Sequence, residues 1–202
     1  MARPIARLSD PEKKRLLEVI NYLNTEELRD FCGHQSIPFL IRVEMHDGRT
    51  VLTRDADRKG VVIDRILHFL NTGEIKPATV FPRSVIGAPR TSGRPRPTDC
   101  VLYGEYRNRD ATILQLMKRL TRGRFEFGAI AQEVLRGCWA EGHAPSYEEF
   151  DQRWLQAEAD HTKPNPEWAF LTDRANGVAG ADWKKIRKQT AAEALALLAK
   201  AS

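Results

Sequence analysis

The sequence has few cysteines and no long apolar run. Its three cysteines, Cys32, Cys100 and Cys138, form no C-x-x-C pair and have no histidine at zinc-ligand spacing. Neither a disulfide framework nor a structural metal is therefore indicated, and all three are expected to be small core residues. No stretch approaches the roughly 20 apolar residues of a membrane span, and the segment from Met1 to Asp10 lacks the apolar core of a signal peptide. We expect a cytoplasmic protein without a membrane partner.

Motifs of catalysis are also missing. The sequence contains no G-x-S-x-G, P-loop, dinucleotide-binding fingerprint or paired-carboxylate motif. The histidines are scattered singly, and a lone histidine is more often structural than catalytic; they are His34, His46, His68, His143 and His161. We therefore predict that the chain is not an enzyme and has no catalytic residue, metal or cofactor.

The sequence does contain enough apolar material for a core and a modest excess of positive charge. Of its 202 residues 42% are hydrophobic, including four Trp and eight Phe, which suffices for one or two domains. The net charge is +5. Residues 1–97 hold 17 Lys and Arg against 12 Asp and Glu, whereas residues 98–202 hold 15 of each kind. An excess confined to the N-terminal half favours a polyanionic partner for that half.

A segment rich in proline and arginine divides the chain. Between Lys76 and Thr98 five prolines alternate with arginines, and no acidic residue occurs. This composition is typical of an extended basic linker that does not pack into a core. The predicted parts are an N-terminal module over residues 1–76, a linker over 77–97 and a helical domain over 98–202.

The N-terminal module is predicted to contain two helices, a hairpin and a third helix. Ser9 and Asn24 each precede a glutamate by three residues, as in the capping boxes that begin helices. The Asp47-Gly48 step between two β-branched runs is a strong hairpin signal. The predicted elements are a helix over 10–23, a helix over 25–33, a hairpin over 39–53 and a helix over 58–72.

The C-terminal part is expected to be helical throughout, which makes the fold class mainly α. Asp110 and Ser146 are expected N-caps, Asn165 starts a further helix, and the last helix covers about 181–200. Trp183 and Ile186 are expected to face inward from that last helix. Aromatic residues recur on helical faces and are expected to form a core; stacking platforms for single strands are the less favoured interpretation. They are Phe125, Phe127, Phe150, Trp154, Trp168, Phe170 and Trp183.

Parts of the N-terminal module resemble the SAP motif, a helix-loop-helix module that binds DNA. The stretch from Thr25 to Cys32, the pair Ile37-Pro38 and the pair Phe69-Leu70 match in order. In its second half the family has a Lys, a branched apolar residue three positions later and an Arg three after that. Those positions are Lys59, Val62 and Arg65. The resemblance implies a SAP-like module with an inserted β-hairpin, in contact with duplex DNA.

Two positions depart from that family. Where SAP motifs usually have Gly two residues before the Lys, this chain has Asp57, and the short family loop is lengthened by the predicted hairpin. The C-terminal part is similar to a domain of unknown function that often follows SAP motifs in bacterial proteins. That second resemblance implies no activity. Its matching positions are Tyr106 to Asn108, Gly123, Phe125, Phe127, Ser146-Tyr147, Trp154 and Trp183-Lys184.

The first candidate DNA contact is the start of the third helix. Unpaired backbone N–H groups at a helix N-terminus attract phosphate, and Arg58 and Lys59 lie beside it, with Arg65 further along. Phosphate contacts position a protein without reading base sequence, so binding with little sequence specificity is expected. The alternative is that these cations only solvate a helix face.

Other basic segments are weaker candidates. Gly93 to Pro97, with Arg94 and Arg96, is similar to the Gly-Arg-Pro core of AT-hook arms, which insert arginine into narrow minor grooves; a solvated linker is the alternative. Lys184 and Lys188 on the last helix are candidates for a second backbone contact, and a cluster of Lys118, Arg119, Arg122 and Arg124 is similar in kind. Runs of this sort are usually just solvated.

Two functions therefore remain open. The preferred one is a non-catalytic protein whose SAP-like module contacts the phosphate backbone of duplex DNA, with the C-terminal domain as a platform for a protein partner or a second copy. The alternative is a protein–protein interaction adaptor without significant nucleic-acid affinity. Asp57 favours the adaptor, and the arginine-rich linker favours DNA.

Overall fold

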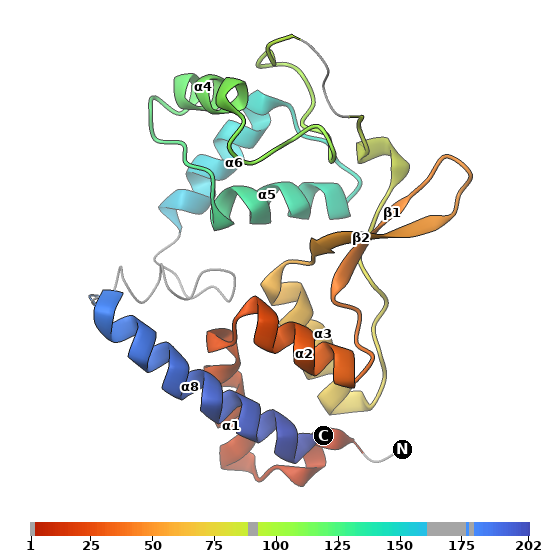
Figure 1. Ribbon diagram of the computed structural model, residues 1–202, viewed down its shortest axis with the longest axis vertical. Coiled ribbons are helices and arrows are strands. Elements are labelled where there is room, and N and C mark those ends of the chain that lie inside the picture. The colour runs from red at the N-terminus through yellow and green to blue at the C-terminus, as the bar shows by residue number, and fades with distance from the viewer. Residues whose placement is uncertain (1–2, 89–92, 161–176, 178–179) are drawn as a thin grey trace. The chain divides into compact units, whose positions relative to one another are not determined.

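A computed structural model describes residues 3–88, 93–160, 177 and 180–202 (Figure 1). The described part is mainly helical, as predicted, with one small sheet. The elements in chain order are η1 (Pro4–Arg7), α1 (Asp10–Val19), η2 (Ile20–Tyr22), α2 (Thr25–His34), β1 (Leu40–Glu44), β2 (Thr50–Ala56), α3 (Lys59–Thr72), β3 (Val80–Phe81), η3 (Arg83–Val85), α4 (Ala111–Leu120), α5 (Ala129–Ala140), α6 (Tyr147–Ala159) and α8 (Gly180–Ala201). The helix expected to start at Asn165 lies outside the described residues.

The chain forms two compact units that interleave along the sequence. Unit 1 consists of Met1–Leu40, Asp55–Ala78 and Thr162–Ser202, and unit 2 of Ile41–Arg54 and Thr79–His161. These boundaries differ from the expected ranges 1–76 and 98–202. The hairpin belongs to unit 2 because Ile41 packs in the core of that unit, and α8 belongs to unit 1 because its apolar side packs on α1 and η2.

Local signals explain the helices of unit 1. At α1 and α2 both halves of the predicted capping box are present, at Ser9 and Asn24. The first helix ends earlier than expected, at Val19, and continues as the short 3-10 turn η2. The helix α3 ends at Gly73, whose φ of 78° is the left-handed conformation that glycine adopts without strain. The starts of α1 and α2 and the end of α3 therefore have a residue-level cause.

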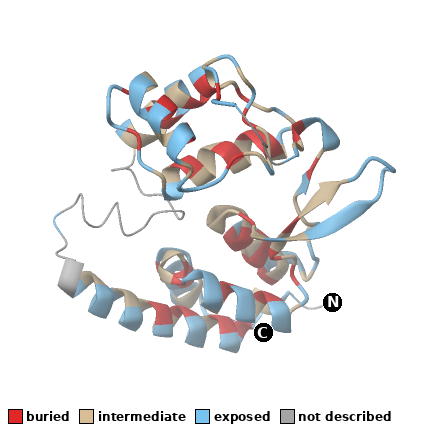
Figure 2. Cartoon of the chain, turned by 45° about the horizontal axis from the view of Figure 1, so that its top comes forward, coloured by how far each residue is buried: buried red, intermediate tan, exposed pale blue. Residues whose placement is uncertain are grey.

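The apolar core of unit 1 is completed by α8. Ala191, Ala194 and Leu198 are buried against α1 and η2, and buried residues recur along one side of the helices (Figure 2). Two ion pairs tie α8 to α1, Arg15 to Glu193 at 2.8 Å and Lys200 to Glu12 at 2.6 Å. Hydrogen bonds from Lys200 and from Ser9 lower the pKa of Glu12 to about 2.

Unit 2 combines the small sheet with helices α4, α5 and α6. The strand order is β2-β1-β3, and β1 pairs in parallel with β3, with Arg42 opposite Val80. The predicted N-caps Asp110 and Ser146 are confirmed, since each side chain accepts a backbone N–H of its helix. The interior is aromatic, with mostly edge-to-face contacts among the rings of Phe81, Tyr103, Tyr106, Phe125, Phe127, Trp139, Phe150 and Trp154. The prediction of an aromatic core is confirmed for Phe125, Phe127, Phe150 and Trp154; Trp168 and Phe170 lie outside the described part.

The predicted linker is largely folded. Phe81 and Val85 are fully buried in the core of unit 2, and Ile86 forms a bridge with Tyr103. Farther along, Pro95 is buried and the Pro97 carbonyl accepts the N–H of Glu148 at the start of α6. The prolines and arginines suggested an extended segment, but the apolar residues between them supply the burial that holds it in place.

Candidate nucleic-acid interface

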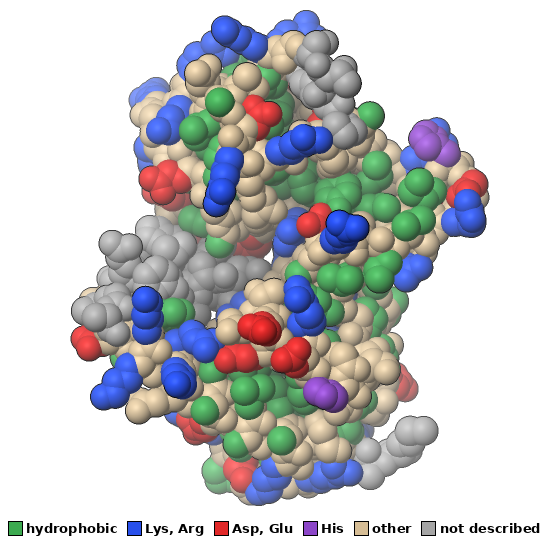
Figure 3. Space-filling model, in the orientation of Figure 1, with side chains coloured by type: hydrophobic (Ala, Val, Ile, Leu, Met, Phe, Trp, Pro, Cys, Tyr) green, Lys and Arg blue, Asp and Glu red, His purple; other side chains and the backbone are tan. Residues whose placement is uncertain are grey.

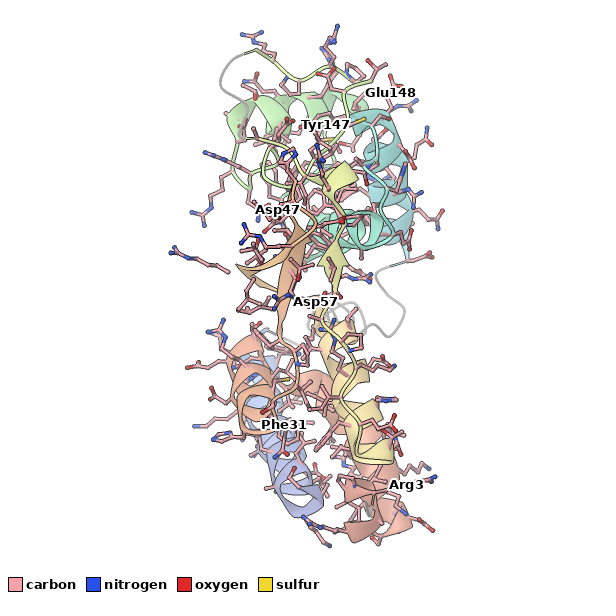
Figure 4. All side chains as sticks on the ribbon, turned by 90° about the vertical axis from the view of Figure 1, so that its right-hand side faces the viewer. Arg3, Phe31, Asp47, Asp57, Tyr147 and Glu148 are labelled. Carbon is pink, nitrogen blue, oxygen red and sulfur yellow. The ribbon has the colours of Figure 1, made fainter. Side chains whose placement is uncertain are left out.

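The turn before α3 is closed by a buried ion pair. Asp57 lies where β2 leads into α3 (Figure 4), and its Oδ2 accepts a hydrogen bond from Arg65 Nη2 at 2.8 Å. The two side chains are only 2% and 4% exposed. The guanidinium also donates to the carbonyls of Pro38 and Pro77, each at 3.1 Å. Arg65 is therefore a structural residue, and the expectation that it contacts DNA is corrected.

This ion pair changes the role expected for the N-terminus of α3. The Arg58 N–H donates to Asp57 Oδ1 at 2.8 Å, so a carboxylate of the chain itself lies where an external phosphate was expected. Because Arg65 neutralises that carboxylate, Asp57 does not present a free negative charge to the surface. A phosphate contact here has to come from side chains and not from the amide that Asp57 already uses.

Arg58 and Lys59 differ in how they are engaged. Lys59 is half-buried, and its Nζ donates to the Asn21 carbonyl in the middle of η2. Arg58 is also half-buried, and its Nε is buried without a hydrogen-bond partner among the described residues. Lys59 thus anchors α3 to η2, whereas the Arg58 Nε makes no such bond within the described residues.

The basic run of α8 reaches the same edge of unit 1. Arg187 Nη1 donates to the Tyr22 carbonyl at 3.5 Å and to Glu27 Oε2 at 2.9 Å. Tyr22 follows Asn21, the residue that Lys59 contacts, so side chains from α3 and α8 meet at neighbouring residues of η2. We define the basic edge as Arg58, Lys59, Lys184, Arg187 and Lys188.

The lysines of this run point to solvent. Lys184, Lys185 and Lys188 are exposed, and none has a salt bridge among the residues described. Figure 3 shows Lys and Arg side chains gathered over the exposed start of α8. Ile186, expected inside, is 39% exposed, and Trp183 is half-buried, because the buried stripe of α8 lies farther along, from Ala191 onward.

Negative charge limits the basic edge on one side. The first turn of α2 carries Glu26 and Glu27, and Asp30 follows one turn later. Glu27 is paired with Arg187, but Glu26 and Asp30 are exposed. The outer face of α2 is therefore unfavourable for a polyanion.

The candidate arginines of the segment that was predicted to be a linker, Arg94 and Arg96, lie in unit 2. Arg94 is exposed, whereas Arg96 pairs with Asp99 at 3.1 Å and follows the buried Pro95. An AT-hook arm needs a free extended segment, and this one is fixed against the start of α6. Arg96 is thus tied to Asp99, but its side chain remains 80% exposed, so both Arg94 and Arg96 keep the exposure that was expected.

The remaining sequence predictions agree with the structure in part. Cys32 and Cys138 are buried as expected, but Cys100 is exposed. In the cluster after α4, Lys118, Arg119 and Arg122 are exposed, while Arg124 pairs with Glu158. No group of three or more His, Cys, Asp or Glu that could hold a metal ion is found within the described residues. In the same part of the chain no helix is long and apolar enough to cross a membrane.

Sequence reasoning missed the meeting of α3 and α8. The bonds that hold Lys59 and Arg187 in place end on the backbone carbonyls of Asn21 and Tyr22, which have no sequence signature. The Asp57–Arg65 pair did leave a signal, since an acid replaced the expected glycine eight residues before a family arginine. Comparisons with protein-family models, with curated proteins and with solved structures found no match.

Proposed function

We propose that this chain binds the phosphate backbone of duplex DNA through the basic edge of unit 1, with little sequence specificity. The observation that carries the proposal is the pair of contacts to neighbouring carbonyls, Lys59 to Asn21 and Arg187 to Tyr22. They bring together two basic segments that lie about 125 positions apart in the sequence. The remaining cations, Arg58, Lys184 and Lys188, are then available to successive phosphates.

The chemistry of these residues suits a backbone contact. Lysine is a flexible point charge on a long stem, which suits a sugar-phosphate backbone better than the fixed edge of a base. The basic segment at the start of α8 is short, so it can neutralise only a few phosphates. Binding should therefore be weak at physiological salt. The proposed role is non-catalytic, and it needs no metal or cofactor.

One observation favours the adaptor as a second candidate. The hairpin carries large apolar side chains in water, since Met45 is 41% exposed, Val51 47% and Leu52 54%. Apolar side chains gathered on one surface element mark sites of protein contact more often than of nucleic-acid contact. Under this alternative the basic edge would only solvate unit 1.

Fluorescence anisotropy of a labelled duplex, titrated with the full chain at low salt, tests the proposal. We expect Lys184→Glu/Lys188→Glu to weaken binding by at least about tenfold, because charge reversal repels phosphate. The matched control is Lys118→Glu/Arg119→Glu, which changes the net charge equally but lies in unit 2. An equal loss in both variants, or no binding of duplex by the wild type, would refute the basic edge as the DNA contact.

A further inference from the structure

The small sheet of unit 2 carries much of the apolar surface of the described residues. Of the eight large apolar side chains that are exposed in this part of the chain, four lie on the sheet, namely Met45, Val51, Leu52 and Val80. Figure 3 shows hydrophobic side chains gathered over the hairpin, with Lys and Arg side chains beside them. An exposed apolar patch with a polar rim marks a site of contact with another molecule.

The outer face of this sheet is distinct from the face that closes the core of unit 2. On the inner face Ile41 and Phe81 are fully buried. Successive side chains of a strand alternate between the two faces, so Arg42 and its register partner Val80 lie side by side on the outer face. Arg42 Nε donates to Thr50 Oγ1 at 3.1 Å, which brings β2 onto the same face.

The cations of this face have no acidic partner among the described residues. Arg42 donates from Nε and Nη2 to Thr50, and its Nη1 takes no part in these bonds. Leu52 and Arg54 follow Thr50 at intervals of two along β2, and both are exposed. We define the hairpin surface as Arg42, Leu52, Arg54 and Val80.

The acidic residues of the hairpin are already in use. Asp47 is bonded to the side chain and the N–H of Arg49. Glu44 Oε2 accepts the N–H of Arg83 at the start of η3, at 3.1 Å. Asp55 is half-buried and has an interaction of its own. The hairpin surface therefore combines apolar side chains with positive charge that the chain itself does not pair.

We propose that the hairpin surface binds a segment of another protein that combines acidic with large apolar side chains. The apolar side chains of that segment cover Leu52 and Val80, and its carboxylates pair with Arg42 and Arg54. A nucleic-acid backbone matches the arginines but leaves the two apolar side chains in water. An acidic protein segment satisfies both halves of the surface.

This proposal is independent of DNA binding. The hairpin surface lies in unit 2 and shares no residue with the basic edge of unit 1. Loss of one function therefore leaves the other measurable in the same full-length chain.

Selection from a library of random peptides displayed on phage tests the chemistry of the partner. The full chain is immobilised at physiological salt and the enriched peptides are sequenced. We expect them to contain an excess of Asp and Glu together with Leu, Ile, Phe or Trp. An enriched set without acidic residues would overturn the proposal, and so would a library in which no peptide is enriched.

Fluorescence anisotropy of one enriched peptide, labelled and titrated with the full chain, tests the location. We expect Leu52→Thr/Val80→Thr to weaken binding by at least about tenfold, because the apolar contact is lost. Arg54→Glu should weaken it to a similar degree, because it repels carboxylates. All three side chains are exposed, so these changes leave the fold intact.

Two control variants separate this surface from the other basic segments. Arg119→Glu reverses an exposed arginine elsewhere in unit 2, and Lys184→Gln/Lys188→Gln neutralises the basic edge. Neither should change the affinity for the peptide. A loss in Lys184→Gln/Lys188→Gln as large as that in Leu52→Thr/Val80→Thr would place the peptide on the basic edge and overturn the proposal.

Two other occupants are distinguished with the same apolar variant. Co-sedimentation with phosphatidylglycerol vesicles that Leu52→Thr/Val80→Thr abolishes would assign the surface to a membrane. A dimer in sedimentation velocity that this variant abolishes would assign it to a second copy of the chain. Either result would overturn the proposal.

Discussion

The buried pair of Asp57 and Arg65 leads to the most specific prediction for stability. Arg65 binds the Asp57 carboxylate and the carbonyls of Pro38 and Pro77, each close in sequence to one of the points where the chain crosses between unit 1 and unit 2. Replacing Arg65 by Met keeps an unbranched apolar stem but removes the guanidinium group and with it all of these bonds. It leaves a carboxylate that is 2% exposed without its cation.

Removing one partner of a buried ion pair costs about 3–5 kcal/mol, because the other charge stays buried and unpaired. We expect Arg65→Met to fall in this range. Asp57→Asn should cost less, since Arg65 keeps both carbonyl partners. The double variant should cost less than the sum of the single ones, with a coupling of about 1–3 kcal/mol. The matched control is Lys76→Met, which breaks a pair with Asp64 whose side chains are 40% and 65% exposed, and it should cost at most about 1 kcal/mol.

Hydrogen exchange of the full chain, followed on peptides of α2 and α3, measures the free energy of unfolding for unit 1 alone. A stability of Arg65→Met equal to that of Lys76→Met would refute the structural role given to Arg65. Additive single and double variants would refute the direct pairing of Asp57 with Arg65.

Three further predictions follow from burial, close contacts and ionisation. Cys100 should react at once with a thiol reagent, whereas the buried Cys32 and Cys138 should react only on unfolding. Burial also raises the pKa of Cys32 to about 11, which slows its reaction further. More than one rapidly reacting thiol per chain would contradict the burial. Gly104→Ala should destabilise unit 2 by at least about 2 kcal/mol in urea melts, because the φ of Gly104 is 95° and the new Cβ would lie 2.5 Å from the Gly87 carbonyl oxygen. The control Gly33→Ala, whose new Cβ meets open space, should not destabilise the chain in this way. The pKa of Glu12 is lowered to about 2 in the folded chain, so its pairing with Lys200 contributes stability above pH 4.5 that is lost as the pH falls toward 2. In thermal melts, acidification should therefore lower the melting temperature of Lys200→Met less than that of the wild type. An equal decrease in both would contradict the pair.

The sequence was informative where a structure is decided by neighbouring residues. Capping boxes at Ser9 and Asn24, the Asp47-Gly48 turn and the stop at Gly73 each depend on a few adjacent residues, and the structure has all of them. Their physical cause is the satisfaction of backbone groups within one turn, which a short segment can encode.

Features that depend on distant partners were not predictable in the same way. The position of α8 on unit 1 depends on Arg15 and Glu27, which lie more than 150 residues earlier in the chain. The folding of the Pro-rich segment depends on burial of Phe81 and Val85 against helices that come later. Composition describes what a segment prefers in isolation, and tertiary burial overrides that preference.

The candidate site was predicted in part for the same reason. Exposure of Lys184 and Lys188 follows from a run of cations on one helix, which is a local pattern. The burial of Arg65 follows from a pair closed across the start of α3, and the meeting of α3 with α8 at η2 requires the whole of unit 1. A residue-by-residue transfer from a family motif cannot distinguish a cation that binds a phosphate from one that binds its own chain.

The most direct test of the basic edge is the salt dependence of duplex binding, measured for the wild type and for Lys184→Gln/Lys188→Gln. A plot of the logarithm of the binding constant against that of the salt concentration has a slope of about −0.9 for each phosphate neutralised. The account predicts a wild-type slope that becomes shallower by about 0.9 for each lysine removed. An unchanged slope in the variant, or a wild type that does not bind duplex DNA even at low salt, would contradict it.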